Sequence, residues 1–163
     1  MTQMGTFGVI DLASAVPLRS KVVRLEPQFG CSLLDAKTYL DVVPVGPWLI
    51  DLGRCPDLRR IWIQEVRNAD LGYTIHADLN LTDLRRHLRK FALAEVEGHP
   101  APVLFRYFDA RIIRAFLLEV FTPEERQSFL APMHSLEVRG ADGSGTLVFE
   151  PKRSDQLRAL QVT

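Results

Sequence analysis

The chain has 163 residues, which is enough for one domain and short for two. Hydrophobic residues make up 47% of it and charged residues 25%, as in an ordinary globular protein with a packed core. Lysine plus arginine and aspartate plus glutamate both number 20, so the net charge is zero. This balance argues against a protein that binds nucleic acids or acidic membrane surfaces, because such proteins usually carry an excess of basic residues.

Targeting signals are missing from the sequence. The N-terminal segment has no basic stretch before an apolar one, and no segment has the roughly 20 apolar residues of a membrane span. The two cysteines, Cys31 and Cys55, have no metal or redox spacing, and we expect buried free thiols in a reducing compartment. The sequence therefore predicts a cytoplasmic protein.

Strand-like and helix-like patterns alternate along the chain. Short apolar runs predict strands, and apolar spacings of three and four predict amphipathic helices. In chain order we expect a strand at 7–12, a helix at 14–25, strands at 29–34 and 43–52, a helix at 55–68, a strand at 71–79, a helix at 81–98, a strand at 103–108, helices at 111–121 and 122–132, and a hairpin at 135–151. The helix caps that we expect are Asp57, Thr82, Asp109 and Thr122, the last with Glu125 in a capping box.

This alternation predicts an α/β fold. We expect a single domain of alternating strands and helices around a mixed, partly parallel sheet, with a C-terminal hairpin. The domain is placed at residues 1–150, and residues 151–163 are treated as a short C-terminal tail.

The motifs of common enzymes are missing from the sequence. It has no G-x-S-x-G, no phosphate-binding loop before a helix, and no pair of histidines with metal-ligand spacing. We therefore expect no cofactor and no metal ion. Four aspartates stand at or near the ends of strand-like runs, where ligands bind in open α/β sheets: Asp11, Asp35, Asp51 and Asp109. Because aspartate also starts turns and caps helices, we favour a structural role for them, while a small enzyme using them stays open.

The segment VLFRYFDARIIRAFL, residues 103–117, places a charge inside an apolar run. We expect Asp109 to cap the helix that follows. We expect Arg106 to pair with a carboxylate of another element, because an unpaired charge is costly to bury. The pair is thus interpreted as a structural brace.

Four stretches together resemble a known family: FGVIDLA, GPWLIDL, LTDLRRHLRKFALAEV and VLFRYFDARIIRAFL. The last contains the most specific signature, Phe105, Arg106, Tyr107, Phe108 and Asp109, although Ala110 stands where the family often has proline. In this order and spacing, over roughly residues 5–134, the chain resembles the effector-adaptor (chaperone) proteins of bacterial type VI secretion, also known as domain of unknown function 4123.

The resemblance implies an adaptor and not an enzyme. Such an adaptor binds a toxin effector protein and loads it onto the valine–glycine-repeat spike protein, and its partners include neither nucleic acid nor membrane. We expect partner-binding residues on one helix face or in the tail: Arg85, Arg86, Arg89, Leu157 and Leu160. For the arginine face we favour a solvated helix surface, and the tail could equally be frayed. Two alternatives stay open, the small enzyme and a structural or oligomeric module without cargo.

Overall fold

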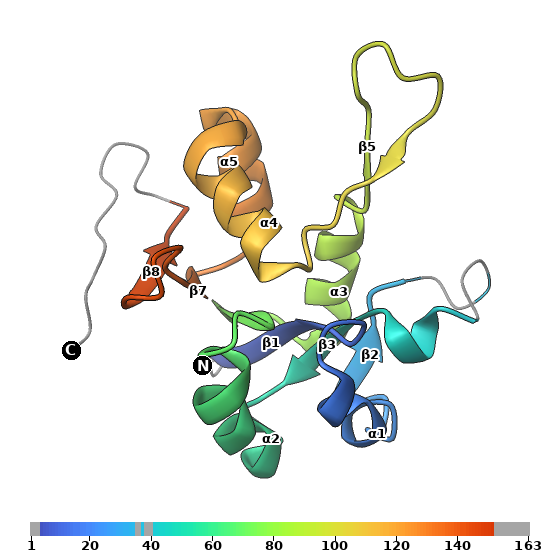
Figure 1. Cartoon of the computed structure of the whole chain (residues 1–163), viewed down its shortest axis with the longest axis vertical. Coiled ribbons are helices and arrows are strands. Elements are labelled where there is room, and N and C mark those ends of the chain that lie inside the picture. The colour runs from blue at the N-terminus through green and yellow to red at the C-terminus, as the bar shows by residue number, and fades with distance from the viewer. Residues whose placement is uncertain (1–3, 35–36, 38–40, 152–163) are drawn as a thin grey trace.

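The computed structural model describes residues 4–34, 37 and 41–151. Its centre is a six-stranded sheet with the order β2-β3-β1-β4-β7-β8, and β5 and β6 pair separately (Figure 1). The strands are β1 Gly5–Asp11, β2 Gly30–Ser32, β3 Pro47–Asp51, β4 Gly72–Ala77, β5 Leu93–Ala94, β6 Val103–Leu104, β7 Ser135–Arg139 and β8 Thr146–Phe149. The α-helices are α1 Arg19–Val22, α2 Pro56–Ile61, α3 Leu81–Arg89, α4 Ala110–Ala115 and α5 Pro123–Leu130. Short 3-10 turns cover Val16–Leu18 and Val43–Val45, and α2 and α4 continue as π-helical turns over Trp62–Val66 and Phe116–Val120.

The strand pairing corrects the predicted fold class. Every pair of neighbouring strands is antiparallel, so the predicted mixed, partly parallel sheet is wrong. The prediction assumed that strands joined by a helix are neighbours. In the structure β3 lies between β1 and β2, and β1 lies between β3 and β4. The connections through α1 and α2 therefore each span an intervening strand, which is the split β-α-β arrangement, whereas β4 and β7, joined through α3, α4 and α5, are antiparallel neighbours.

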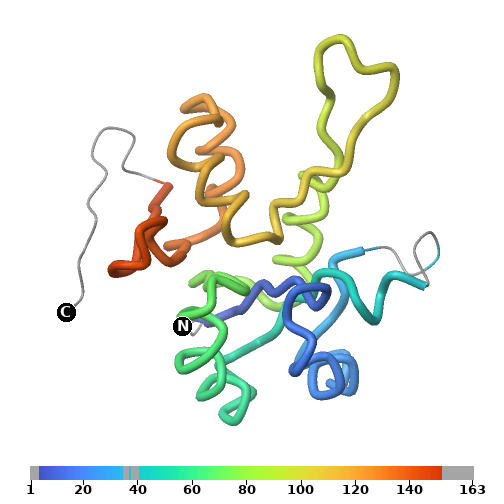
Figure 2. Tube along the Cα trace, viewed as in Figure 1, coloured from blue at the N-terminus to red at the C-terminus, as the bar shows by residue number. Residues whose placement is uncertain are grey.

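The sheet is covered on both faces, because side chains of each strand alternate between them. Figure 2 shows α3, α4 and α5 on one side of the sheet and α1 and α2 on the other. Phe7 and Val9 of β1 belong to the core under the first group, and Ile10 belongs to the core under the second. The domain thus has two apolar cores separated by one sheet.

Two glycines let the segment after β3 approach the sheet closely. A Cβ atom at Gly8 would lie 2.6 Å from the ring of Trp62, and one at Gly72 would lie 2.5 Å from the carbonyl oxygen of Val9. The indole Nε1 of Trp62 donates a hydrogen bond to Thr74 Oγ1 at 3.1 Å. The indole ring therefore contacts β1 and β4 at two glycines, since a Cβ atom at Gly72 would also lie 3.0 Å from the ring.

Helix α3 is shorter than the sequence predicts. It ends at Arg89 instead of residue 98, and the backbone N–H of Phe105 donates to the carbonyl of Ala92 at 2.9 Å. The predicted strand 103–108 shrinks to Val103–Leu104, which pairs with β5 outside the main sheet. Residues 93–104 form a hairpin, here called the arm, that projects away from the sheet and from the helices that cover it (Figure 1).

The expected helix caps are confirmed in two cases and wrong in two. Asp109 caps α4, and Thr122 with Glu125 forms the capping box of α5. Helix α3 is capped by Asn80, not Thr82, because the Asn80 side chain accepts from the N–H of Asp83. Helix α2 has no side-chain cap, and Asp57 lies within its first turn.

The hairpin expected near the C-terminal end is confirmed as β7 and β8. No helix in the described part of the chain combines the length and the apolar character needed to cross a membrane.

Candidate functional site

The signature residues form a tight turn between β6 and α4. Phe105, Tyr107 and Phe108 are buried, and their rings contact one another at centroid distances of 6.1 Å for Phe105–Tyr107 and 5.7 Å for Tyr107–Phe108. Asp109 has an extended backbone, and its Oδ1 accepts from the N–H of Arg111 at 3.0 Å. The aromatic residues thus anchor the turn in the core, and Asp109 starts the helix.

Arg106 joins this turn to the end of β1. Its Nη2 atom lies 3.2 Å from Oδ2 of Asp11 and 3.4 Å from Oδ2 of Asp109. Both carboxylate side chains are 6% exposed, whereas the side chain of Arg106 is 48% exposed. The other oxygen of Asp11 accepts from the N–H of Ala13 at 3.0 Å. The expected brace is therefore present, with Asp11 as the partner from another element.

Arg111 makes the closest contact with Asp109. Its Nε and Nη2 atoms meet the two carboxylate oxygens at 3.1 Å and 2.9 Å, which is the two-point geometry that favours arginine. Burial acts to raise the pKa of Asp109, but the hydrogen bonds from Arg111 and the charges of Arg111 and Arg106 outweigh it and lower that pKa. Asp109 is therefore ionised at neutral pH and is not poised to donate a proton.

A further ion pair, between Arg114 and Asp70, lies beside these contacts and was not predicted from the sequence. Nη1 of Arg114 lies 2.9 Å from both carboxylate oxygens of Asp70 and 2.8 Å from the carbonyl oxygen of Arg139. The side chain of Arg114 is only 10% exposed, and Asp70 adopts a left-handed φ of 57°. The signal was an arginine among the apolar residues of helix 111–121, but nothing local identified its partner 44 positions earlier.

These residues border a cavity of about 110 Å³ lined by Asp11, Ser14, Asp70, Asp109, Arg111 and neighbouring backbone. Asp11, Asp70 and Asp109 each pair with an arginine, so the arrangement joins elements instead of exposing reactive carboxylates. Within the described residues, no group of three or more His, Cys, Asp or Glu side chains is placed to hold a metal ion. The cluster of Asp11, Asp70, Arg106, Asp109, Arg111 and Arg114 is called the ion-pair cluster below.

The four strand-end aspartates do not meet in one place. Asp11 and Asp109 lie together, but Asp51 pairs with Phe7 while Asp11 pairs with Pro47, so Asp51 lies at the opposite end of these strands. Its Oδ1 accepts from the backbone N–H of Arg54 at 3.2 Å. Asp35 lies outside the described residues. Of the three aspartates that the structure describes, Asp11 and Asp109 thus share a site, and both pair with arginine there.

The arginines expected to face a partner divide into two kinds. Arg85 donates to the carbonyl oxygens of Ser32 at 2.7 Å and Leu34 at 3.4 Å, which ties α3 to the end of β2. Arg86 is exposed and pairs with Asp83 at 2.7 Å, and Arg89 is also exposed. Arg85 therefore has a structural contact, and two arginines remain on the surface. Leu157 and Leu160 lie outside the described residues.

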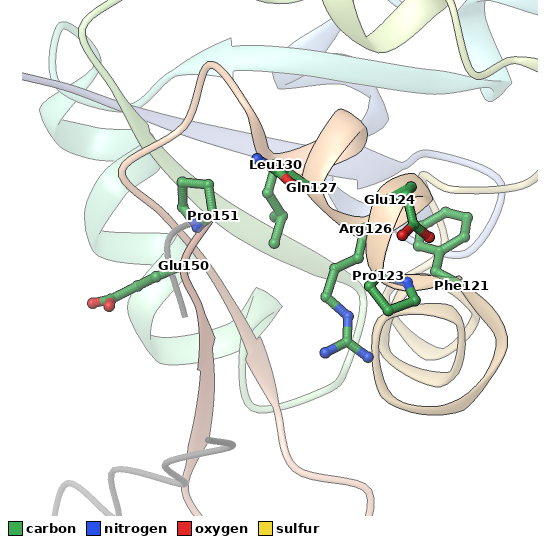
Figure 3. Close-up of a pocket in the computed structure, with 8 residues that line it drawn as sticks. All are labelled: Phe121, Pro123, Glu124, Arg126, Gln127, Leu130, Glu150 and Pro151. Carbon is green, nitrogen blue, oxygen red and sulfur yellow. The ribbon is translucent and has the colours of Figure 1, made fainter. Parts of the chain in front are cut away.

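Two further surface features were not foreseen in the sequence. The arm exposes three apolar side chains, Leu93, Val96 and Leu104. A groove of about 250 Å³ lies between α5 and the end of β8, with Phe121, Pro123, Leu130 and Pro151 among its lining residues (Figure 3). Within it the Nε atom of Arg126 is buried and has no hydrogen-bond partner among the described residues. The arm is thus apolar, whereas the groove is mixed, with Glu124, Arg126, Gln127 and Glu150 beside its apolar residues.

The fold and the cluster define a small antiparallel domain, covered by helices on both faces and braced by arginine–carboxylate pairs. One family, described as a domain of unknown function (DUF4123), matches residues 6–128, about three quarters of the chain. The chain therefore belongs to this family. The match includes the whole ion-pair cluster and the arm and stops before β7. No curated protein and no solved structure matches the chain significantly.

Proposed function

We propose that the chain is an adaptor, or chaperone, of bacterial type VI secretion. In this role it binds a toxin effector in the producing cell and loads it onto the valine–glycine-repeat spike protein. Membership of the DUF4123 family and the signature at 105–109 support the proposal, because the resemblance to type VI adaptors rests on the same residues.

One observation carries the proposal: the polar signature residues pair with each other, while unpaired apolar side chains gather on a projecting hairpin. Arg106 and Asp109 act within the ion-pair cluster, and Leu93, Val96 and Leu104 face solvent on the arm. Exposed apolar residues that cluster on a projection are typical of protein–protein contact. A binding protein needs such a surface, whereas an enzyme needs a site with available reactive groups.

An adaptor must contact two proteins, and the molecule offers two separate surfaces. The arm follows α3 (Figure 1), while the groove lies between α5 and the end of β8 (Figure 3). Binding of two partners at different sites is consistent with delivery of a cargo to a spike.

Co-purification tests the proposal. The gene is expected to lie beside a gene for a spike protein and a toxin–immunity pair, and the tagged chain is co-expressed with each of these products. We expect the toxin and the spike protein to co-elute with the chain, and the immunity protein alone not to. If neither toxin nor spike co-elutes with a folded chain, the adaptor proposal is wrong.

Light scattering on the isolated chain separates the adaptor from the cargo-free oligomeric module. An adaptor without partners is expected to be a monomer that forms a defined complex when toxin is added. A chain that assembles into one large species, unchanged by toxin, contradicts the proposal.

A further inference from the structure

We propose that the arm binds an extended segment of a partner protein, in which apolar residues alternate with lysine or arginine, as an added strand on the outer edge of β5. This inference rests on the adaptor proposal and deepens it, because it names the surface and the chemistry of the segment that is recognised.

The first support is an apolar pair on one face of the arm. Leu93 and Leu104 lie directly opposite each other in the β5–β6 register and are 58% and 46% exposed. The next pair, Ala94 and Val103, lies on the other face, and Ala94 packs against the core. Opposite residues of an antiparallel pair share a face and interact as a unit. The arm therefore presents two adjacent leucines to solvent, a contact surface for apolar side chains of a partner.

The second support is an open strand edge. The N–H of Phe105 donates to the carbonyl of Ala92, so these opposite residues are joined by one backbone hydrogen bond. Antiparallel ladders alternate between bonded and non-bonded positions, so the backbone groups of Leu93 in β5 turn away from β6, and the same alternation carried one residue past the strand turns those of Glu95 outward. An outward row of N–H and C=O groups is what a partner strand pairs with.

The two edges of the arm are not equivalent. Pro100 and Pro102 lie on the β6 side, and proline has no N–H to donate. By the same alternation Pro102 occupies an outward position, so that edge is blunted against strand pairing. Residues 93–95 of the β5 side, Leu-Ala-Glu, contain no proline, and the turn of the arm follows, where the N–H of His99 donates to the carbonyl of Val96 at 3.0 Å. An added strand therefore pairs with β5.

The third support is charge. Between Phe91 and Phe105 the sequence holds Glu95 and Glu97 but no lysine or arginine, although the whole chain has 20 of these basic residues and no net charge. The arm is therefore a local acidic surface on a neutral protein. Complementary charge mainly determines which partners are accepted, so the matching segment carries lysine or arginine beside its apolar residues.

The experiment measures fluorescence anisotropy of labelled ten-residue peptides titrated with the whole chain. One peptide alternates valine and lysine, and its matched control alternates valine and glutamate. We expect the lysine peptide to bind at least about tenfold more tightly, because like charges at an interface are strongly unfavourable. Equal binding of the two peptides, or no binding of either, overturns the inference.

Variants of the arm test each support separately. Glu95→Lys with Glu97→Lys is expected to reverse the preference toward the glutamate peptide, a gain of binding that misfolding cannot produce. The double variant Leu93→Ser, Leu104→Ser is expected to bind the lysine peptide about tenfold more weakly than the wild type does. Circular dichroism checks that this variant is folded. An unchanged preference in the first variant, or unchanged affinity in the second, contradicts the proposal.

A backbone-modified peptide tests strand addition itself. N-methylation at every residue of the lysine peptide removes the donors of both strand edges while keeping every side chain, so an added strand cannot form. Loss of binding supports the proposal, and retained affinity overturns it. The co-purification experiment is independent: if toxin and spike co-elute while the peptides show no preference, the adaptor stands and the arm proposal is wrong.

Discussion

The three arginines of the ion-pair cluster differ in their burial and in the number of contacts that each one makes. Arg114 is nearly buried and meets both oxygens of Asp70 and a backbone carbonyl. Arg106 is half-exposed and reaches two carboxylates through one nitrogen. Water can replace part of the Arg106 contact but little of the Arg114 contact. We therefore expect Arg114, not the signature arginine, to contribute more to the stability of the fold.

Replacing these arginines by methionine tests that order. Arg114→Met is expected to lower the free energy of unfolding by about 3–5 kcal/mol, because it leaves a largely buried carboxylate unpaired. Arg106→Met is expected to cost about 1–3 kcal/mol, the usual cost of a buried acceptor that loses one partner. Urea denaturation measures both. Arg86→Met, which breaks an exposed pair, is the control at about 0–1 kcal/mol. Equal losses at Arg106 and Arg114 would contradict the assignment.

The charge of Asp109 predicts an acid-dependent contribution to stability. Its pKa is lowered in the folded state, so the unfolded chain binds the proton more readily. The stabilisation is fully present above the ordinary carboxyl pKa of about 3.9 and is lost as the pH falls through the lower folded-state pKa.

Asp109→Asn isolates that charge, because asparagine also caps helices well. We expect the variant to be less stable than the wild type at pH 7 and to lose less stability between about pH 5 and pH 2, as thermal unfolding would measure. Some acid dependence remains, since the hydrogen bond from His76 also lowers the pKa of Glu137 against its burial. Identical pH profiles of variant and wild type would show that Asp109 is not held by the arginines.

At the scale of elements, the packing of the Trp62 segment on the sheet depends on glycine. Gly72→Ala places a methyl group 2.5 Å from the carbonyl oxygen of Val9, and backbone atoms in a central strand pair cannot move aside cheaply. We expect a loss of about 1–3 kcal/mol in the free energy of unfolding, as for other overpacked cores. Gly53→Ala is the control, because its Cβ would meet the side-chain oxygen of Asp51 at 3.3 Å and the backbone nitrogen of Thr6 only at 4.0 Å. A Gly72→Ala protein as stable as this control would contradict the packing.

The elements were easier to predict than their pairing. Alternating apolar runs located β1, β3 and β4 to within a few residues, and local capping chemistry located the starts of α4 and α5. The end of α3 was missed because Phe91, Ala92 and Leu93 continue a helical pattern. Pairing with β6, nine to eleven residues further on, overrides that pattern. The parallel sheet was wrong for the same reason, since no local signal says which strand inserts between two connected ones.

At the scale of the whole molecule, the cluster shows where sequence reasoning stops. The sequence predicted that Arg106 pairs with a carboxylate of another element, but it did not indicate which of the strand-end aspartates supplies that carboxylate. Asp11, the partner in the structure, is 95 positions away. Asp70 and Arg114 were missed altogether, because their contact depends on the docking of α4 against the turn before β4. Residue types indicated a brace, and only the folded topology identified its members.

The molecule as a whole separates a braced scaffold from a projecting contact element. The ion-pair cluster ties the end of β1, the turn before β4 and the start of α4 together, directly beyond the arm. Substitutions in the cluster are therefore expected to act through stability, whereas substitutions on the arm are expected to act through partner binding.

The central claim is that this chain delivers a toxin to the secretion spike, and secretion measures it directly. In a producing strain without the gene, the toxin encoded beside it is expected to be unstable or absent from the secreted fraction, while the spike protein is still exported. The wild-type gene is expected to restore toxin export, and the Leu93→Ser, Leu104→Ser variant is expected not to. A toxin that remains stable and fully secreted without this protein would contradict the account.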